Sequence, residues 1–206
     1  MARVGLQNFT VAKLTQDDRE GVEYETPKRI AKMIEVSLTP QTSEGSLYAD
    51  DVLSEYNADV TGYDVSINID DLTPENRAFL LGYDVDDNGA IATTTDVPDE
   101  KFAVMFQSRR SDGSNEYRVM YKVKFSIPED TYHTKGDSVE YQTPTITGKA
   151  LALDFNNKFD AMLVGNEDNK AITDQWFTEV YVHGGDSGSV SRSEPSSSPI
   201  GEGFGA

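Results

Sequence analysis

The chain has no cysteine, only two histidines, one tryptophan and half as many basic as acidic side chains. Without cysteine it can form no disulfide framework and offers no thiolate as a nucleophile or metal ligand. No apolar run approaches the roughly 20 residues that cross a bilayer, so we expect no membrane segment. The start, MARVGLQNFTVAKL, has no long apolar run after its charge, so we expect no signal peptide and synthesis in a cytosol.

Charge is the strongest bias in the composition. The 206 residues include 36 acidic and 18 basic side chains, which give a formal net charge of -18. Phosphates are repelled by such a surface, and this argues against a protein made to grip DNA. An acidic bias most often serves solubility alone. A chain of this length can form one all-β domain with a core, or a smaller domain with a tail.

Short alternating segments predict a mainly β fold, a β-sandwich or partly closed barrel. Strands are expected over residues 1–14 (with a bend at 7–8), 33–38, 63–69, 145–153 and 176–182, and as a hairpin over 101–127 that turns at 111–115. In the return strand of this hairpin, alternate residues from Tyr117 to Ile127 are expected to share one apolar face. Residues 15–27 are predicted as loop. Residues 1–183 form the predicted domain, and the Gly/Ser/Pro-rich residues 184–206 form a flexible tail.

One short helix is predicted at about residues 73–81. Thr73 can cap its first free amides, Pro74 suits its first position, and Gly82 suits a left-handed stop. A helix of this length does not persist alone. Its apolar residues 79–81 are therefore expected to dock on a sheet.

Two motifs suggest chemistry, and a plain structural interpretation is favoured for each. Residues 84–89 match the front of a calcium loop, but Thr95 stands where a bidentate Glu is needed, which favours an ordinary turn. Residues 185–188, Gly-Asp-Ser-Gly, resemble the nucleophile segment of serine proteases. The only histidine bases are His133 and His183, and a productive nucleophile must be held rigidly, so the segment is interpreted as linker. We expect no catalytic, cofactor or metal site and no enzyme.

Adjacent carboxylates and one basic row complete the candidate chemistry. Successive residues of a strand face opposite sides, so the acidic pairs at 50–51, 70–71 and 86–87 make poor general acid/base couples. A small anion site is one interpretation of the basic row formed by Arg118, Lys122 and Lys124 with Arg109 near it on the partner strand. Pairing with carboxylates of the sheet or of a neighbouring copy is favoured.

Residues 43–72 carry the most informative pattern. Tyr63, Val65, Ile67 and Ile69 alternate with Asp64, Ser66, Asn68 and Asp70. This alternation predicts a strand with one dry face and one wet, acidic face. Residues 41–57 are predicted as a long loop, too polar for a core yet carrying aliphatic residues and tyrosines among acids. A loop that exposes such side chains commonly contacts a partner.

Several segments, taken in order, resemble the major tail tube proteins of long-tailed, non-contractile (siphovirus-type) bacteriophages, in the branch that infects Gram-positive hosts. They are RVGLQNFTVAKL, GVEYETPKRI, SLYADD, DLTPENRAFLLGY and HTKGDSVEYQTPTITGKA, and the resemblance covers most of residues 1–183. It implies a β-sandwich with a flanking helix that forms hexameric rings, stacked into a tube through which DNA is ejected. Residues 184–206 match nothing in that pattern.

The resemblance also implies where copies meet. The 41–57 loop would lie between neighbouring subunits or rings, and the N-terminal arm 1–14 would make similar contacts. The implied subunit-interface residues are Leu47, Tyr48, Ala49, Asp50, Asp51, Val52 and Tyr56. The candidates for an acidic lumen that repels DNA are Asp64, Asp70 and Asp71.

The implied partners are further copies of the chain and tape-measure, tail-terminator and distal tail or baseplate proteins. DNA would pass without specific binding, and no membrane is involved. The implied location is the virion tail, assembled in the host cytoplasm. From the residues alone, two other classes stay open. One is a monomeric β-sandwich binding module that recognises carbohydrate on a virion or cell surface, and the other is a small hydrolase.

Overall fold

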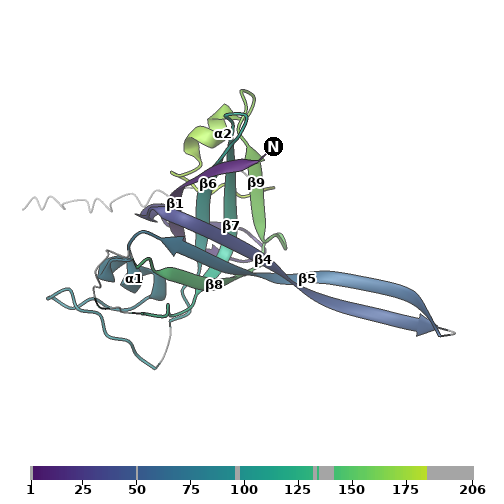
Figure 1. Cartoon of the computed structure of the whole chain (residues 1–206), viewed down its shortest axis with the longest axis horizontal. Coiled ribbons are helices and arrows are strands. Elements are labelled where there is room, and N and C mark those ends of the chain that lie inside the picture. Colours follow the sequence, from purple (N-terminus) through teal and green to yellow (C-terminus); the bar gives the residue numbers. More distant parts are fainter. Residues whose placement is uncertain (1, 50, 96–97, 132–133, 135–141, 185–206) are drawn as a thin grey trace, which may run out of the picture.

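The computed structural model describes residues 2–49, 51–95, 98–131, 134 and 142–184. The described part is mainly β, as predicted, with nine strands in one antiparallel sheet and two helices (Figure 1). The strands are β1 (Arg3–Asp17), β2 (Val22–Tyr24), β3 (Lys28–Ala31), β4 (Met33–Ala49), β5 (Val52–Ile69), β6 (Phe102–Arg110), β7 (Asn115–Phe125), β8 (Thr145–Leu151) and β9 (Asp160–Val164). The helices are α1 (Pro74–Leu81) and α2 (Lys170–Gln175).

The strands are ordered β2-β1-β6-β7-β8-β5-β4, with β3 beside β1 and β9 beside β7. The sheet does not close into a barrel, so within the described chain β4 pairs only with β5 and is an edge strand. The predicted strand at residues 1–14 is confirmed as β1. Its predicted bend is a register shift between Gln7 and Thr10, where Asn8 has a φ of 62°.

The first core lies on one face of the sheet, between its central strands and α1. Its largest fully buried side chains include Phe9, Phe102, Ile67, Ile69 and Ile146. The predicted helix is confirmed with its caps. The Thr73 hydroxyl accepts a hydrogen bond from the Asn76 amide at 3.3 Å, and Gly82 is left-handed with a φ of 69°. Leu80 and Leu81 are buried, and Phe79 meets Phe102 edge to face, so the helix docks as expected.

The second core lies on the opposite face of β1, β6 and β7, where residues 153–182 cover the sheet. The strand predicted at 176–182 is wrong. After α2 the chain continues in turns, because the amides of Thr178 and Glu179 bond to the Gln175 carbonyl. The buried residues Trp176 and Val180 are four apart, which is a helical spacing and not an alternating one. The short helix α2, which has no side-chain cap, was not predicted.

A bulge in β7 corrects the prediction that its apolar residues share one face. Phe102 pairs with Val123 while Val104 pairs with Met120, so two residues of β7 oppose Ala103. A bulge of this kind reverses the alternation after it. Val119 and Tyr121 therefore belong to the second core, whereas Val123 and Phe125 belong to the first.

Two predicted loops are strands in the structure. Residues 15–27 hold the end of β1 and all of β2. Residues 41–49 and 52–57 form paired strands that belong to β4 and β5. Residues 41–49 show no apolar period in the sequence, because the described side chains of this ribbon are exposed on both faces.

Candidate functional site

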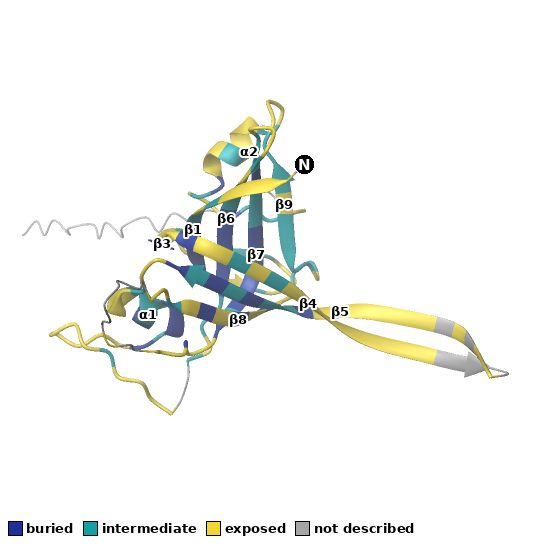
Figure 2. Ribbon diagram, in the orientation of Figure 1, coloured by how far each residue is buried: buried dark blue, intermediate teal, exposed yellow. Residues whose placement is uncertain are grey.

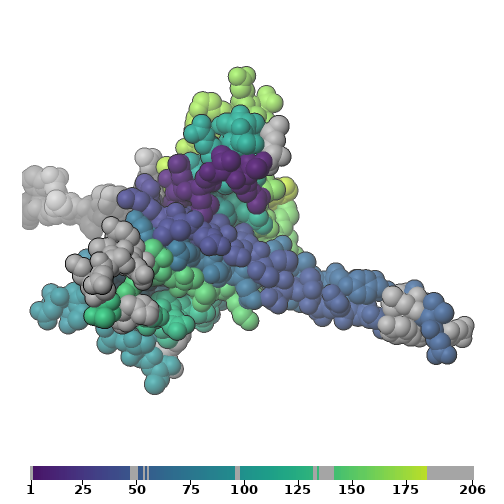
Figure 3. Space-filling model, viewed as in Figure 1, coloured from purple at the N-terminus to yellow at the C-terminus, as the bar shows by residue number. Residues whose placement is uncertain are grey.

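The β4–β5 hairpin extends far beyond the body of the molecule (Figures 1 and 3). Strand β8 accompanies β5 only as far as the pair of Tyr63 with Ala150. At the next residue, Gly62, a Cβ would lie 3.0 Å from the Ala150 carbonyl oxygen, so only glycine fits this close crossing without displacement. Beyond it, β5 pairs with β4 alone. Residues 41–62 are called the distal hairpin below.

The distal hairpin is exposed on both faces (Figure 2). Val52 is 66% exposed, Tyr56 57% and Val60 42%. An isolated two-stranded ribbon is marginally stable at best in water, because it buries little apolar surface. The distal hairpin therefore presents apolar side chains that nothing in the described chain covers.

A bulge aligns part of this apolar surface with the core. Gln41 pairs with Gly62 and Thr42 with Val60, so Thr61 is the extra residue. Because alternate residues of β4 share a face, Thr42 lies on the same side as Val36 and Leu38, which pack on the first core. Val60, Ala58 and Tyr56 pair with Thr42, Glu44 and Ser46 and so continue that side. These three residues of β5 are called the apolar stripe.

The sequence reasoning missed Val60 and Ala58, although a signal was present. The apolar positions change from odd numbers (63, 65, 67, 69) to even numbers (60, 58, 56) across Thr61 and Gly62. Such a change of phase is typical of a bulge. It could have extended the predicted strand by several residues.

The predicted subunit-interface residues meet at the tip of the hairpin. Leu47, Tyr48 and Ala49 pair with Glu55, Leu53 and Val52, and the side chains of Leu47, Tyr48 and Ala49 lie outside the described part. Asp50 also lies outside the described residues. Asp51 closes the turn with a φ of 60°, a left-handed conformation that Asp tolerates better than most residues. Val52 and Tyr56 are exposed, and the role of the set stays a prediction.

The predicted lumen residues are not brought together. Asp64 lies on the face of β5 opposite the core, where it accepts a hydrogen bond from Gln41 at 2.5 Å. Asp70 lies six residues further along, on the order of 20 Å away. Its carboxylate accepts hydrogen bonds from the amides of Lys32 and Asp71, both at 3.0 Å. Asp70 thus stabilises the backbone between β3 and β4, and Asp71 is exposed beside it.

The face that carries Asp64 is polar across three strands. Its residues on β4, β5 and β8 are Glu35, Ser37, Thr39, Asp64, Ser66, Asn68, Thr145, Thr147 and Lys149. Hydroxyl and amide groups predominate, with two carboxylates and one ammonium group. Among the described residues, most of this face is polar and uncharged, and the exposed Leu151 continues it at the end of β8.

The predicted pairing of the basic row with carboxylates is confirmed within the chain. Arg118 contacts Asp160 at 2.7 Å, Lys124 contacts Asp99 at 2.8 Å, and buried Lys122 lies 2.5 Å from Asp17 and 2.8 Å from Asp154. Burial opposes the charge of Lys122, but hydrogen bonds to Asp154 and Asp17 outweigh it and raise the pKa of the lysine. Arg109 makes no ion pair within the described residues. The paired cations offer no free anion site.

The motifs with a chemical alternative give no reactive constellation. The turn interpretation of residues 84–89 is confirmed, because the Asp86 carboxylate accepts hydrogen bonds from the amides of Asn88 and Ala90. His133 and residues 185–188 lie outside the described part. His183 Nδ1 lies 2.6 Å from Lys158 Nζ. Among the described residues, no group of acids and histidines is arranged to hold a metal. None of the described helices is long and apolar enough to cross a membrane.

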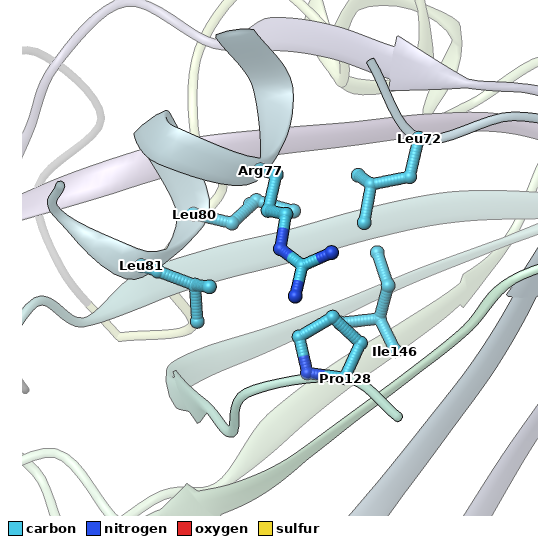
Figure 4. A pocket seen from close by; sticks show the side chains of 6 residues that line it. All are labelled: Leu72, Arg77, Leu80, Leu81, Pro128 and Ile146. Atoms are coloured by element: carbon cyan, nitrogen blue, oxygen red, sulfur yellow. The ribbon is translucent and has the colours of Figure 1, made fainter. Parts of the chain in front are cut away.

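A shallow hollow beside α1 is too small for a ligand site. Figure 4 shows its lining, made by Leu72, Arg77, Leu80, Leu81, Pro128 and Ile146. The open space is about 170 Å³, below the roughly 300 Å³ at which ligand pockets begin. Arg77 is held at its rim by Asp130 at 2.6 Å. The distal hairpin therefore remains the candidate site.

Comparison of the chain with protein-family models and with curated proteins finds no match.

Proposed function

We propose that the chain is a structural subunit that polymerises as stacked hexameric rings into a phage-type tail tube, a conduit for DNA ejection. One observation carries the proposal: a long hairpin leaves the body and exposes both faces, with an apolar stripe and no cover from the described chain. Burying such a ribbon against neighbours would supply the apolar contact that it lacks alone.

The open edge of the sheet supports assembly with further copies. In the described chain, β4 pairs on one side only along its 17 residues. An exposed strand edge of this length invites pairing with another chain, and closure of a ring removes it. The mostly uncharged polar face of β4, β5 and β8 is suited to line a passage that DNA traverses without binding. The tape-measure, terminator and baseplate partners and the virion location belong to this proposal.

The assembly has an electrostatic cost. Six copies at -18 each carry a formal charge of 6 × -18 = -108. Self-repulsion of this kind weakens association when few ions screen it, since the screening length grows from about 8 Å at physiological salt to about 30 Å at 0.01 M. We expect polymerisation to weaken at low salt.

Leu47→Asp tests the proposal at the hairpin tip. A carboxylate in an apolar contact between copies must be desolvated, so we expect the polymer to be lost while the melting temperature of the monomer is unchanged. Negative-stain electron microscopy and light scattering measure the polymer, and circular dichroism measures melting. Ile172→Asp is the matched control, because Ile172 is an exposed apolar residue on α2.

Either outcome is informative. Hollow rings or tubes with sixfold end views from the wild type, lost in Leu47→Asp and kept in Ile172→Asp, support the proposal. If Leu47→Asp polymerises normally and only its melting changes, the hairpin tip is not an assembly contact. A chain that stays monomeric and binds a glycan, with binding lost in Tyr56→Ala, would instead be a carbohydrate-binding module.

A further inference from the structure

The distal hairpin and its tip carry charge of one sign only. Residues 41–62 include five acidic side chains and no lysine or arginine. Those with described side chains, Glu44, Asp51 and Asp59, are exposed. A surface that covers the apolar stripe must therefore approach this negative potential, which favours a surface with positive charge. In so acidic a chain few such surfaces exist.

Half of the 16 described lysines and arginines are already paired closely with carboxylates. Arg3, Lys13, Arg77, Lys101, Arg118, Lys122, Lys124 and Lys170 make contacts of 3.0 Å or less. The carboxylate of such a pair largely cancels the attraction of the cation for a further negative charge. The receptor for the hairpin is thus expected among the exposed cations that lack a close carboxylate.

Three such cations gather at β3 and the residue after it. Arg29 makes no ion pair within the described residues, and the Lys28 ammonium lies over the Phe79 ring at 4.9 Å, a contact that keeps its charge. Lys32 is 3.8 Å from Asp70, a long contact between exposed groups. All three side chains are exposed. Lys28, Arg29 and Lys32 are called the basic edge.

The outer side of β3 is partly occupied by α1. Within the described chain β3 pairs as a strand only with β1, through Phe9, Thr10 and Val11. The Ile30 carbonyl accepts a hydrogen bond from the Asn76 side chain at 2.9 Å, so it is not open to a partner strand. The contact expected at β3 is therefore one between charged side chains.

The basic edge and the hairpin tip cannot meet within one molecule. Figure 2 shows β3 on the side of the body away from the distal hairpin. Lys32 leads directly into β4, and β4 runs the whole length from this edge to the tip. The acidic and basic ends of the same strand thus point in opposite directions. Complementary patches at opposite ends generate head-to-tail contacts, which close into rings or continue as filaments.

We propose that the distal hairpin of one copy docks on the basic edge of the next copy. The proposal rests on the proposed function, which it deepens by naming the receptor surface of the assembly contact. The occupant is a second copy of this chain because the same molecule carries both charges, at two places that it cannot itself join.

Arg29→Glu tests the contact against the matched control Arg109→Glu. Both arginines are exposed, both lie on strands, and neither makes an ion pair within the described residues. We expect Arg29→Glu to reduce polymer mass at least tenfold by light scattering, while Arg109→Glu retains it. Circular dichroism melting checks that both monomers fold.

Charge reversal on the hairpin supplies the rescue. Asp59→Lys combined with Arg29→Glu restores opposite charges across the contact, and we expect polymer to return toward the wild-type amount. With Arg29→Ala, the deficit relative to the wild type should narrow as salt rises from about 0.1 M to about 1 M, where the screening length falls to about 3 Å.

The two proposals fail in different ways. If the wild type and Arg29→Glu polymerise equally, or if Arg109→Glu is as defective as Arg29→Glu, the basic edge is not the receptor and the proposed function stands. If the double variant stays as defective as Arg29→Glu, the pairing with the hairpin is overturned. A wild type that forms no rings or tubes counts against both.

Discussion

The two halves of the β4–β5 hairpin have the same secondary structure but different surroundings. Near the body, residues 33–40 pair with residues 63–69, β8 adds a third strand, and Val65, Ile67 and Ile69 are buried. Beyond Gly62 the same two strands stay paired, but nothing in the described chain covers them. Pairing alone thus sets the backbone of both halves, while burial stabilises only one. The apolar residues of the distal half contribute little to folding, which is the reason to seek their use outside the monomer.

The largest expected difference between the two regions is the effect of removing an aromatic ring. Phe102 is fully buried in the first core, between Phe79 and Phe125. We expect Phe102→Ala to lower the free energy of unfolding by about 3–5 kcal/mol, from lost transfer energy and a residual cavity. Tyr56→Ala, on the distal hairpin, should change it by no more than about 0.5 kcal/mol. Urea denaturation followed by tryptophan fluorescence measures both.

These two variants test whether the distal hairpin is uncovered in the monomer. If Tyr56→Ala lowers the free energy of unfolding by about 2 kcal/mol or more, as expected for a partly buried aromatic residue, the monomer covers its own hairpin. The apolar stripe would then be core, and the proposed assembly contact would lose its basis. Equal polymerisation by Tyr56→Ala and the wild type would count against the proposed assembly contact but not against the fold.

The second prediction compares a buried ion pair of the body with an exposed carboxylate of the hairpin. The buried Asp17 carboxylate accepts hydrogen bonds from the Lys122 ammonium group and from the amides of Asp154 and Phe155. Asp17→Ala leaves these donors without that acceptor, so we expect a loss of about 2–3 kcal/mol in the free energy of unfolding. Asp59→Ala on the hairpin is the control, with a change within about 0.5 kcal/mol. If Asp17→Ala is as stable as the wild type, the buried pair does not stabilise the body.

Sequence reasoning predicted the elements whose signals are local. The strand at Tyr63–Ile69 alternates between polar and apolar residues, the hairpin of β6 and β7 has its turn residues at 111–115, and the helix at 74–81 has its caps in Thr73 and Gly82. Each signal is local, so it could be read without the fold. The mainly β fold class followed from them.

The predictions that were wrong have other physical causes. The distal hairpin changes its apolar phase at Thr61, and β7 changes its face at a bulge, so neither shows an unbroken period. The turns at 176–182 depend on Trp176, whose burial is decided by the second core and not by its neighbours in sequence. The basic edge could not be predicted either. Its three cations stand out only because other lysines and arginines are paired with carboxylates that are distant in sequence.

The smallest expected effect is on the acid stability of an exposed ion pair. Hydrogen bonds from Lys124 and Lys101 lower the pKa of Asp99 from 3.8 to about 2. The folded state therefore binds this proton less readily than the unfolded state, and the stabilisation is present above about pH 4 and lost as the pH falls through 2. We expect Asp99→Asn to flatten the decrease in the free energy of unfolding between these values. The same change on the hairpin, Asp59→Asn, should leave that decrease as in the wild type, since Asp59 contacts no cation within the described residues. Urea denaturation at a series of pH values measures it. An equal flattening by both variants would mean that the pairing of Asp99 does not set the acid limb and that the acidic chain responds as a whole.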